Sequence, residues 1–265
     1  MSSSELAYKI PEKMYGKFRK RSKQLLESIV QFIEPNVGET IVDVGTGAGF
    51  LAFGLAEKVG ETGRVIGFDI SKSAIRQARQ RLAKKSHYQM LEFRVSDVYT
   101  IPLGDNFADV VCCKSLIAGL DFQEKAIREM ARVAKQGGRV TVAEMGELVG
   151  LPSQIKRALD LPHFNERNLR DLFQKAELKN IETKRREPPI VTDVPTFEWV
   201  TKNLFGDNGL WKLAVEEGVD EDKVLHAHKK LVRRIKTTGL KFGTGEVFCK
   251  GVKTARAEPQ KSKHS

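Results

Sequence analysis

The chain has 265 residues, of which 40% are hydrophobic and 30% are charged, and its formal net charge is +11. This balance excludes an intrinsically disordered chain and predicts one large globular domain, or a core domain with an elaborated part. No apolar run approaches the roughly 20 residues that a membrane helix needs, and no apolar stretch of signal-peptide type begins the chain, so we expect no transmembrane segment and a cytoplasmic location.

The first predicted element is an amphipathic helix over 17–34, which follows an irregular arm over 1–16. The apolar residues of 17–34 recur at helical spacing, and basic residues cluster near its start. Residues 35–39, which begin with Pro35, form a break.

Short apolar strands and helices then alternate along the chain. The predicted strands cover 40–44, 64–68, 91–95, 108–113, 139–144, 178–184 and 246–252. The predicted helices cover 50–59, 72–85, 122–134 and 165–176, and Gly137 and Gly138 are expected to stop the third of them. This alternation predicts a doubly wound, Rossmann-like α/β fold: a seven-stranded, mostly parallel sheet with helices on both faces.

The stretch 187–243 separates the last two predicted strands and is too long for a simple loop in a compact domain. It contains helical patterns, so we interpret it as a helical insertion before the last strand. We therefore divide the chain into an N-terminal arm and helix (1–34), a core (35–186 plus 244–253), the insertion as an acceptor cover (187–243) and a disordered basic tail (254–265).

The net charge favours acidic partners such as nucleic acid, an anionic membrane surface or a polyanionic substrate. The alternative is a solvated, lysine-rich surface with a basic tail, and we favour it because charge alone identifies no partner. A predicted helix in 224–236 carries five basic residues: Lys229, Lys230, Arg233, Arg234 and Lys236. Such a helix can lie on anionic lipid or RNA, or it can pack its apolar stripe on the domain while its charges stay in water.

The three cysteines, Cys112, Cys113 and Cys249, suggest no disulfide framework and no zinc site. Cys112 and Cys113 are adjacent and raise the alternative of an arsenite or redox role. They end an apolar strand, where cysteine behaves as a small hydrophobic residue, so we favour a packing role.

The most informative segment is the turn after the first predicted strand, where Gly45, Gly47 and Gly49 follow Asp43. Glycines at a strand-to-helix turn let the backbone approach a ligand closely, at the N-terminus of the following helix. A dinucleotide fingerprint has the spacing Gly-x-Gly-x-x-Gly, whereas this turn reads Gly-x-Gly-x-Gly, which argues against a nicotinamide dehydrogenase.

Three aspartates stand at the ends of the first three predicted strands: Asp43, Asp69 and Asp97. Ligands of open α/β sheets bind at the carboxyl ends of the strands, and an acid after the second strand can accept hydrogen bonds from ribose hydroxyls. Each aspartate could instead cap a turn or a helix, but three in register favour a binding site.

These segments resemble a known family. Residues 42–49 (Val-Asp-Val-Gly-Thr-Gly-Ala-Gly) resemble motif I of class I S-adenosylmethionine-dependent methyltransferases, and 67–70 (Gly-Phe-Asp-Ile) resemble their second motif. Residues 96–98, 101–110 and 129–140 are similar to the later motifs. The order and spacing are most similar to the ubiquinone/menaquinone biosynthesis C-methyltransferases and their relatives. The resemblance covers about 38–184 and the final strand.

The resemblance implies S-adenosylmethionine as methyl donor, S-adenosylhomocysteine as product and no metal. It implies that Gly45, Thr46, Gly47 and Gly49 pass the methionine part of the donor, with Asp43 supporting its amino group. It implies a further set of donor-binding residues: Asp69 for the ribose hydroxyls, Ile70 for one adenine face, Asp97 for the adenine amino group with Val98 beside it, Ser96, and the backbone of Cys113 and Lys114 for the methionine end. Tyr15 is a candidate to close over the donor.

A general base is optional, since the sulfonium is already activated and methyl transfer needs mainly alignment and exclusion of water. Glu144, at the end of the fifth predicted strand, and His163, in a loop, are the candidate catalytic residues. The alternatives are a capping or salt-bridging role for Glu144 and a plain surface role for His163.

We therefore expect an enzyme that methylates a small-molecule or lipid-like acceptor by in-line displacement. One alternative is a methyltransferase that acts on RNA or protein through its basic surface. We do not favour nucleic acid as the partner, because no appended RNA-binding module and no Asn-Pro-Pro-Tyr type motif is visible. A second alternative is a non-catalytic protein that binds S-adenosylmethionine. The acceptor, the atom methylated and the oligomeric state stay open.

Overall fold

The computed structural model describes residues 12–85, 88–159, 164–188, 190–191, 197–198, 201–202 and 209–255. The chain divides into two compact units, each described by itself below. We call 28–143, 166–183 and 248–265 the sheet unit, and 1–27, 144–165 and 184–247 the helical unit.

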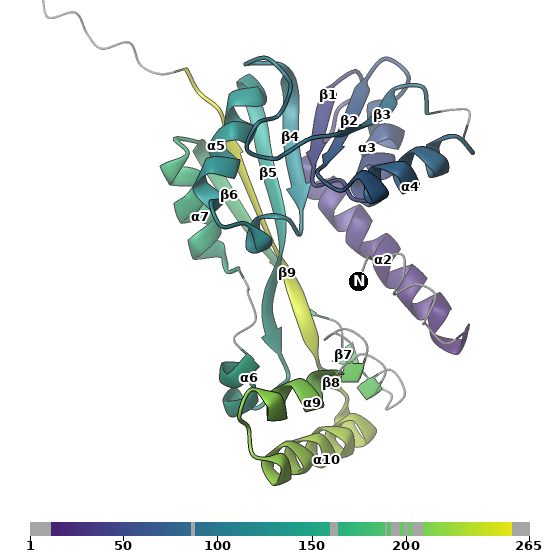
Figure 1. Ribbon diagram of the computed structural model, residues 1–265, viewed down its shortest axis with the longest axis vertical. Helices are drawn as coiled ribbons and strands as arrows, with labels where there is room; N and C mark the ends of the chain where they lie inside the picture. The colour runs from purple at the N-terminus through teal and green to yellow at the C-terminus, as the bar shows by residue number, and fades with distance from the viewer. Residues whose placement is uncertain are drawn as a thin grey trace, which may run out of the picture. The chain divides into compact units, whose positions relative to one another are not determined.

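A seven-stranded sheet with the order β3-β2-β1-β4-β5-β9-β6 forms the core of the fold (Figure 1). Its strands are β1 (Thr40–Val44), β2 (Arg64–Asp69), β3 (Leu91–Val95), β4 (Ala108–Lys114), β5 (Ala134–Val149), β6 (Lys179–Arg186) and β9 (Gly243–Val252). The pairs β1–β2, β2–β3, β1–β4 and β4–β5 are parallel. Lys253, just after β9, exchanges hydrogen bonds with Gly137 and Gly138 near the start of β5, so β9 runs antiparallel to β5. The predicted fold class is thereby confirmed.

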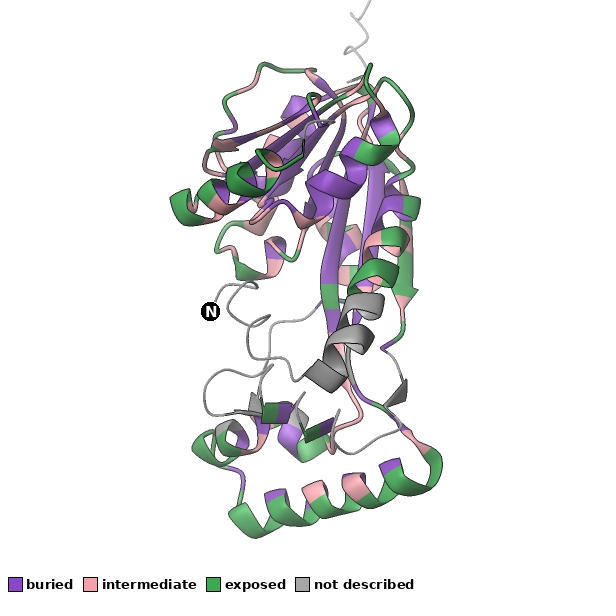
Figure 2. Cartoon of the chain, turned by 90° about the vertical axis from the view of Figure 1, so that its right-hand side faces the viewer, coloured by how far each residue is buried: buried purple, intermediate pink, exposed green. Residues whose placement is uncertain are grey.

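Helices cover the strands of the sheet unit. They are α2 (Glu12–Ile33), α3 (Phe50–Val59), α4 (Lys72–Leu82), the 3-10 turn η1 (Ile117–Gly119), α5 (Gln123–Val133) and α7 (Glu166–Lys175). Helices α3 and α4 pack on β2 and β3, and α5 packs on β4. Consecutive residues of β1, β2 and β4 are buried, as the purple strands of Figure 2 show, and this requires cover on both faces because side chains alternate along a strand.

Two predicted boundaries are wrong. Residues 12–16 are helical and not part of an irregular arm, since α2 begins at Glu12. Gly137 and Gly138 do not stop α5, which ends at Val133; they lie inside β5. A register shift between β4 and β5 falls beside Ala108, and Gly137 has a φ of +77°, so the glycines accommodate an irregularity in the strand.

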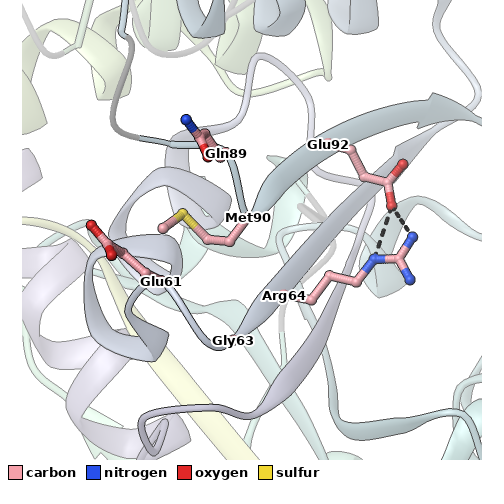
Figure 3. Close-up of a pocket in the computed structure, with 6 residues that line it drawn as sticks. All are labelled: Glu61, Gly63, Arg64, Gln89, Met90 and Glu92. Carbon is pink, nitrogen blue, oxygen red and sulfur yellow. Dashed lines mark hydrogen bonds and ion pairs between the residues drawn. The ribbon is translucent and has the colours of Figure 1, made fainter.

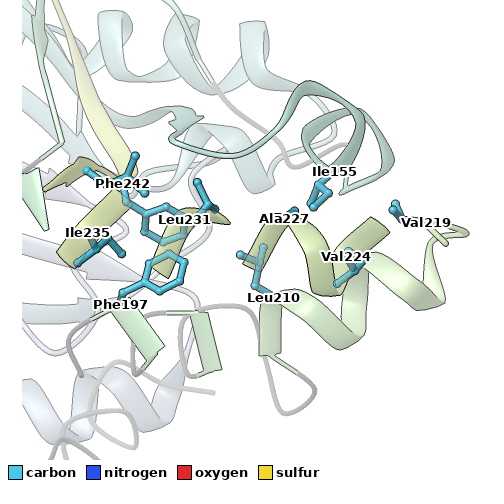
Figure 4. Packing of buried hydrophobic residues seen from close by; sticks show 11 residues of the cluster. Ile155, Phe197, Leu210, Val219, Val224, Ala227, Leu231, Ile235 and Phe242 are labelled. Carbon is cyan, nitrogen blue, oxygen red and sulfur yellow. The ribbon is translucent and has the colours of Figure 1, made fainter. Parts of the chain in front are cut away.

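The helical unit has its own apolar core (Figure 4). Its elements are α6 (Ser153–Leu159), β7 (Ile190–Val191), α9 (Gly209–Glu216), α10 (Glu221–Thr238) and β8 (Leu240–Lys241), which pairs antiparallel with β7. Asp220 caps α10 by accepting a hydrogen bond from the Lys223 amide at 3.1 Å. The core gathers buried residues from α6, α9, α10 and the segments beside them: Ile155, Phe197, Leu210, Ala214, Val219, Val224, Ala227, Leu231, Ile235, Leu240 and Phe242.

The helical unit takes in 144–165 as well as the whole of 187–243, and the domain boundaries drawn from the sequence stay predictions. The predicted tail lies almost wholly outside the described residues, which end at Ala255. Among the helices that are described, none combines the length and the apolar character needed to cross a membrane.

Candidate functional site

The glycine turn lies between β1 and α3, and its three glycines have φ values of +69°, +55° and +85°. A Cβ on Gly45 would lie 2.9 Å from Leu116, and a Cβ on Gly49 would lie 2.7 Å from Phe93. A Cβ on Gly47 would meet nothing within 4 Å. Packing therefore requires two of the glycines, whereas Gly47 faces open space that a ligand can enter.

Asp43 lies beneath this turn, with only 1% of its surface exposed. Its Oδ2 accepts a hydrogen bond from Thr46 Oγ1 at 2.7 Å, and its carboxylate also accepts one from the amide of Ala52 in α3. Burial raises the pKa of Asp43 to about 7, and the hydrogen bonds from Thr46 and Ala52 oppose this rise. The side chain thus joins the end of β1, the turn and the start of α3.

Asp69, the last residue of β2, is held by two backbone amides. Its Oδ2 accepts from Gly47 N and its Oδ1 accepts from Ser71 N, both at 2.8 Å. Each carboxylate oxygen has a second acceptor position, so the side chain can still receive two hydroxyl donors. The Thr46 amide donates to the carbonyl of Phe68 at 2.8 Å. The structure thereby brings Gly47 and Asp69 together, although they are far apart in the sequence.

Asp97 stands after the end of β3, beside the end of β2. The Ser96 amide donates to the carbonyl of Asp69 at 3.0 Å, and Asp97 Oδ1 accepts from the Tyr99 amide at 2.9 Å. Val98 is buried, whereas Ile70 is 70% exposed. The predicted acids and the apolar residues between them therefore follow neighbouring strand ends at one edge of the sheet.

The end of β4 is adjacent to β1 and contributes Cys113 and Lys114. Cys113 is buried, so its thiol is not exposed to a ligand. Lys114 Nζ lies 3.0 Å from Ser115 Oγ and 5.9 Å from the centre of the Phe50 ring. Ser115 has a φ of +51°, a left-handed conformation that is costly for a residue other than glycine and concentrates at functional sites.

Of the two predicted catalytic residues, Glu144 directly follows Ala143, which pairs with Lys114 at the end of β4. Glu144 lies in β5 and is 1% exposed. His163 lies outside the described residues, and of Tyr15 only the position within α2 is described. Their catalytic or lid roles stay predictions.

The three cysteine thiols are free and buried. Burial raises the pKa of Cys249 to about 12 and that of Cys112 well above its usual value, and the nearby Asp43 carboxylate adds to the rise for Cys112. Neither thiol is therefore poised to form a thiolate. In the described part of the chain, no cluster of three His, Cys, Asp or Glu residues could hold a metal ion.

Several residues that support the turn were not predicted from the sequence. Leu116 and Phe93 contact Gly45 and Gly49, and Arg81 Nη1 donates to the carbonyl of Ala48 at 2.6 Å. The cation of Arg81 also lies 4.9 Å from the ring centre of Phe53. Nothing in the local sequence marks these residues, because they reach the turn from β3, α4 and the loop after β4.

A surface cavity of about 480 Å³ lies elsewhere, at the amino ends of β2 and β3 (Figure 3). Arg64 and Glu92 lie at its side and form an ion pair at 2.6 Å. In parallel strands the amino ends are opposite the carboxyl ends, so this cavity is distinct from the edge that carries the glycine turn and the three aspartates.

Comparison with known proteins gives the family. A family model described as "Methyltransferase domain" matches residues 35–188, more than half of the chain. The chain is 34% identical over 118 residues to the demethylmenaquinone methyltransferase of Desulfitobacterium hafniense, covering 44% of this chain and 47% of that protein. It is 31% identical over 119 residues to the arsenite methyltransferase of Halobacterium salinarum, covering 45% of this chain and 30% of that protein. The chain thus spans less than half the length of either relative.

The fold is similar to that of phosphoethanolamine N-methyltransferase 2 of Haemonchus contortus, whose structure is described as a complex with S-adenosyl-L-methionine. The TM-score is 0.57 at 19% sequence identity, over 88% of this chain and 53% of that one. The family model, the relatives and the fold agree with the motifs. The chain belongs to the methyltransferase-domain family, and its resemblance to the class I S-adenosylmethionine-dependent methyltransferases is confirmed.

Proposed function

We propose that the protein transfers a methyl group from S-adenosylmethionine to a small-molecule or lipid-like acceptor and releases S-adenosylhomocysteine. The observation that carries this proposal is the pairing of Gly47 with Asp69. Gly47 borders open space at the turn, and Asp69 is fixed against its amide with both carboxylate oxygens still able to accept. A nucleoside bearing two adjacent ribose hydroxyls suits that carboxylate.

The residues around this pair fit the remaining parts of the donor. The methionine part would pass along the backbone of 45–47, with Asp43 beneath the turn and the backbone of Cys113 and Lys114 at its far end. The exposed side chain of Ile70 and the neighbouring Val98 would flank the adenine, and Asp97 would accept from its amino group. Bound there, the donor supplies a methyl group on a sulfonium, an already activated leaving group.

The chain's own task in the reaction would be alignment and exclusion of water. In-line displacement needs the nucleophile held in one orientation. Binding then meets most of the entropy cost of bringing the two reactants together before the chemical step begins. A base is needed only if the acceptor must lose a proton. Glu144 and His163 remain our candidates for that role, and Tyr15 our candidate to close over the donor.

Among acceptors, an aromatic quinone with an apolar tail suits the chain better than arsenite. Trivalent arsenic is a soft centre that thiolates bind, and the only three cysteines of the chain are all buried. The relative from Desulfitobacterium hafniense is a demethylmenaquinone methyltransferase. We therefore propose a quinone-type acceptor in its reduced, quinol form: a ring carbon of the quinol attacks the methyl group, S-adenosylhomocysteine leaves, and that carbon then gives up its proton to a base or to water.

A calorimetric titration with S-adenosylmethionine, S-adenosylhomocysteine and NADH tests the donor. We expect micromolar binding of both sulfur ligands and none of NADH. Asp69→Asn should weaken the binding of S-adenosylmethionine and of S-adenosylhomocysteine by at least about tenfold, since charge-assisted hydrogen bonds to the ribose are lost. Asp171→Asn, an exposed aspartate on α7, is the matched control and should bind as the unmodified protein does. Full-strength binding by a folded Asp69→Asn variant would contradict the site.

Turnover separates the enzyme from its alternatives. Incubation with S-adenosylmethionine and a short-chain demethylnaphthoquinol should release S-adenosylhomocysteine and a product heavier by one methyl group, as read by mass spectrometry. Donor binding without turnover on this acceptor or on any cell extract would favour a non-catalytic binding protein. Methylation of RNA instead, with steeply salt-dependent binding to bulk tRNA, would favour the nucleic-acid alternative.

A further inference from the structure

Helix α10 has two faces of different character. Val224, Ala227, Leu231 and Ile235 are buried in the core of the helical unit (Figure 4). The opposite face is exposed, as the green surface of the long helix at the foot of Figure 2 shows, and its cations are Lys223, Lys229, Lys230, Arg233, Arg234 and Lys236. At about 100° per residue, these six positions share an arc that does not overlap the buried stripe.

The acids of α10 are confined to its first turn, where Glu221 and Asp222 precede Lys223. The sequence contains no aspartate or glutamate from Lys223 to Gly245. Within the described part of the chain, none of the six cations forms an ion pair with a carboxylate. On three other helices a cation pairs with an acid of the same helix: Lys23 with Glu27 on α2, Arg128 with Glu124 on α5 and Lys212 with Glu216 on α9. A helix that only needed a solvated surface would be expected to mix both signs in the same way.

The apolar face of α10 cannot enter a bilayer, because it forms the core of the unit. Binding through this helix would therefore use charge alone, at the level of a membrane's anionic headgroups. The helix also contains no Phe, Tyr or Trp for bases to stack on, and of its two histidines His228 is engaged with Glu198 and Phe197, which leaves the exposed His226. A flat anionic surface fits a straight basic face without such side chains.

We propose that the basic face of α10, defined by the six cations above, docks on the surface of an anionic lipid bilayer. The choice of a lipid surface over RNA rests on the proposed function, because a quinone with an apolar tail resides in the membrane. Docking holds the enzyme where such an acceptor is concentrated, without a membrane-spanning helix. The contact is peripheral, and high salt releases the protein because it screens the electrostatic attraction.

Sedimentation of the full chain with vesicles tests this proposal. The probes are vesicles of phosphatidylcholine alone and vesicles with roughly 30% phosphatidylglycerol, at about 50 mM and about 500 mM NaCl. We expect binding only to the anionic vesicles and only at low salt. The variant Lys229→Gln/Lys230→Gln/Arg233→Gln/Arg234→Gln should lose at least about tenfold in vesicle affinity, since each basic residue near the surface contributes to attraction. Glutamine keeps the helix, because its helix propensity is similar to that of lysine and arginine.

A matched control removes the same charge from the sheet unit. Lys58→Gln/Arg167→Gln/Lys175→Gln/Lys179→Gln changes four exposed cations and should keep vesicle affinity within about twofold. An equal loss of vesicle affinity in both quadruple variants would show that only the net charge of the protein matters, and it would overturn the proposal. So would binding to neutral vesicles, no binding at low salt, or binding to bulk tRNA in the absence of vesicle binding.

Methyl transfer to a water-soluble, short-chain naphthoquinol separates this proposal from the proposed function. The α10 variant should retain that activity and the calorimetric affinity for S-adenosylmethionine, while it loses vesicle binding. If the unmodified chain binds vesicles but methylates no quinol, the docking surface stands and the proposed acceptor fails. If it methylates the quinol but ignores vesicles, the docking proposal fails alone.

Discussion

At the scale of single residues, the glycine turn separates packing from ligand contact. Gly45 and Gly49 face Leu116 and Phe93, whereas Gly47 faces open space. All three have positive φ, so any side chain there carries some backbone strain. Substitution of Gly47 should therefore affect mainly ligand binding, whereas substitution of Gly45 or Gly49 should affect mainly stability.

We expect Gly47→Ala to cost roughly 1–2 kcal/mol of stability, the strain of a left-handed alanine, and to weaken S-adenosylmethionine binding at least about tenfold, because the methyl group occupies the ligand's space. Gly49→Ala should cost roughly 2–4 kcal/mol, since its Cβ would also clash with Phe93. Urea unfolding and calorimetry measure the two effects. Equal stability losses, with no extra binding defect in Gly47→Ala, would contradict the open space at Gly47.

Asp43 should make the ligand-free protein less stable as pH rises from about 4 to about 7. Its pKa is about 7 in the folded chain against 3.8 for the ordinary side chain, so over this window the folded state binds a proton that the unfolded state has released. Asp43→Asn removes this cost while it can still accept from Thr46. Above about pH 7 the variant should exceed the unmodified protein by on the order of 1–4 kcal/mol, and near pH 4 the difference should vanish.

Urea unfolding of the two proteins at several pH values measures this difference. Stability curves that run parallel from pH 4 to pH 8 would show that the Asp43 carboxylate ionises normally in the folded chain. Thr46→Val is a useful companion variant: it removes the hydrogen bond that favours the charged form, so the decline should continue to higher pH than in the unmodified protein.

At the scale of elements, α10 is held by its apolar stripe and not by its charges. We expect Leu231→Ala to destabilise the protein by roughly 2–4 kcal/mol, because Leu231 is 7% exposed and packs in the core of the helical unit. Leu225→Ala on the same helix is the control: Leu225 is 47% exposed, and its loss should cost less than about 0.5 kcal/mol. Thermal unfolding followed by circular dichroism compares them. Similar losses in both variants would mean that α10 is not anchored by this stripe.

At the scale of the whole molecule, the donor should act as a stabilising ligand. S-adenosylmethionine at about 100 times its dissociation constant should add about 2.7 kcal/mol to the free energy of unfolding, whereas NADH should add nothing. The Asp69→Asn variant should lose most of that gain at the same ligand concentration. A thermal shift of the same size in both proteins would place the ligand away from Asp69.

The sequence by itself determined the alternation of strands and helices and the residues that end the strands. The predicted bounds of β1, α3 and β3 match the structure because apolar periodicity and a flanking turn mark both ends of each. Asp69 and Asp97 were recognised because the carboxyl ends of parallel strands meet at one edge of a sheet. Family membership followed from the same segments, since the motifs lie where the backbone passes the ligand.

Tertiary structure alone decided how the turn is supported and which short elements form. The strands β7 and β8 have two residues each and form only because distant segments of the chain pair with each other. A sequence pattern of two residues is too short to predict a strand. Gly137 and Gly138 read as a helix stop, yet the pairing of β5 with β4 places them inside a strand. The burial of Asp43, the contact of Arg81 with Ala48 and the packing of Leu116 on Gly45 depend on strand order, which brings residues 30 to 70 positions apart into contact and leaves no trace in local sequence.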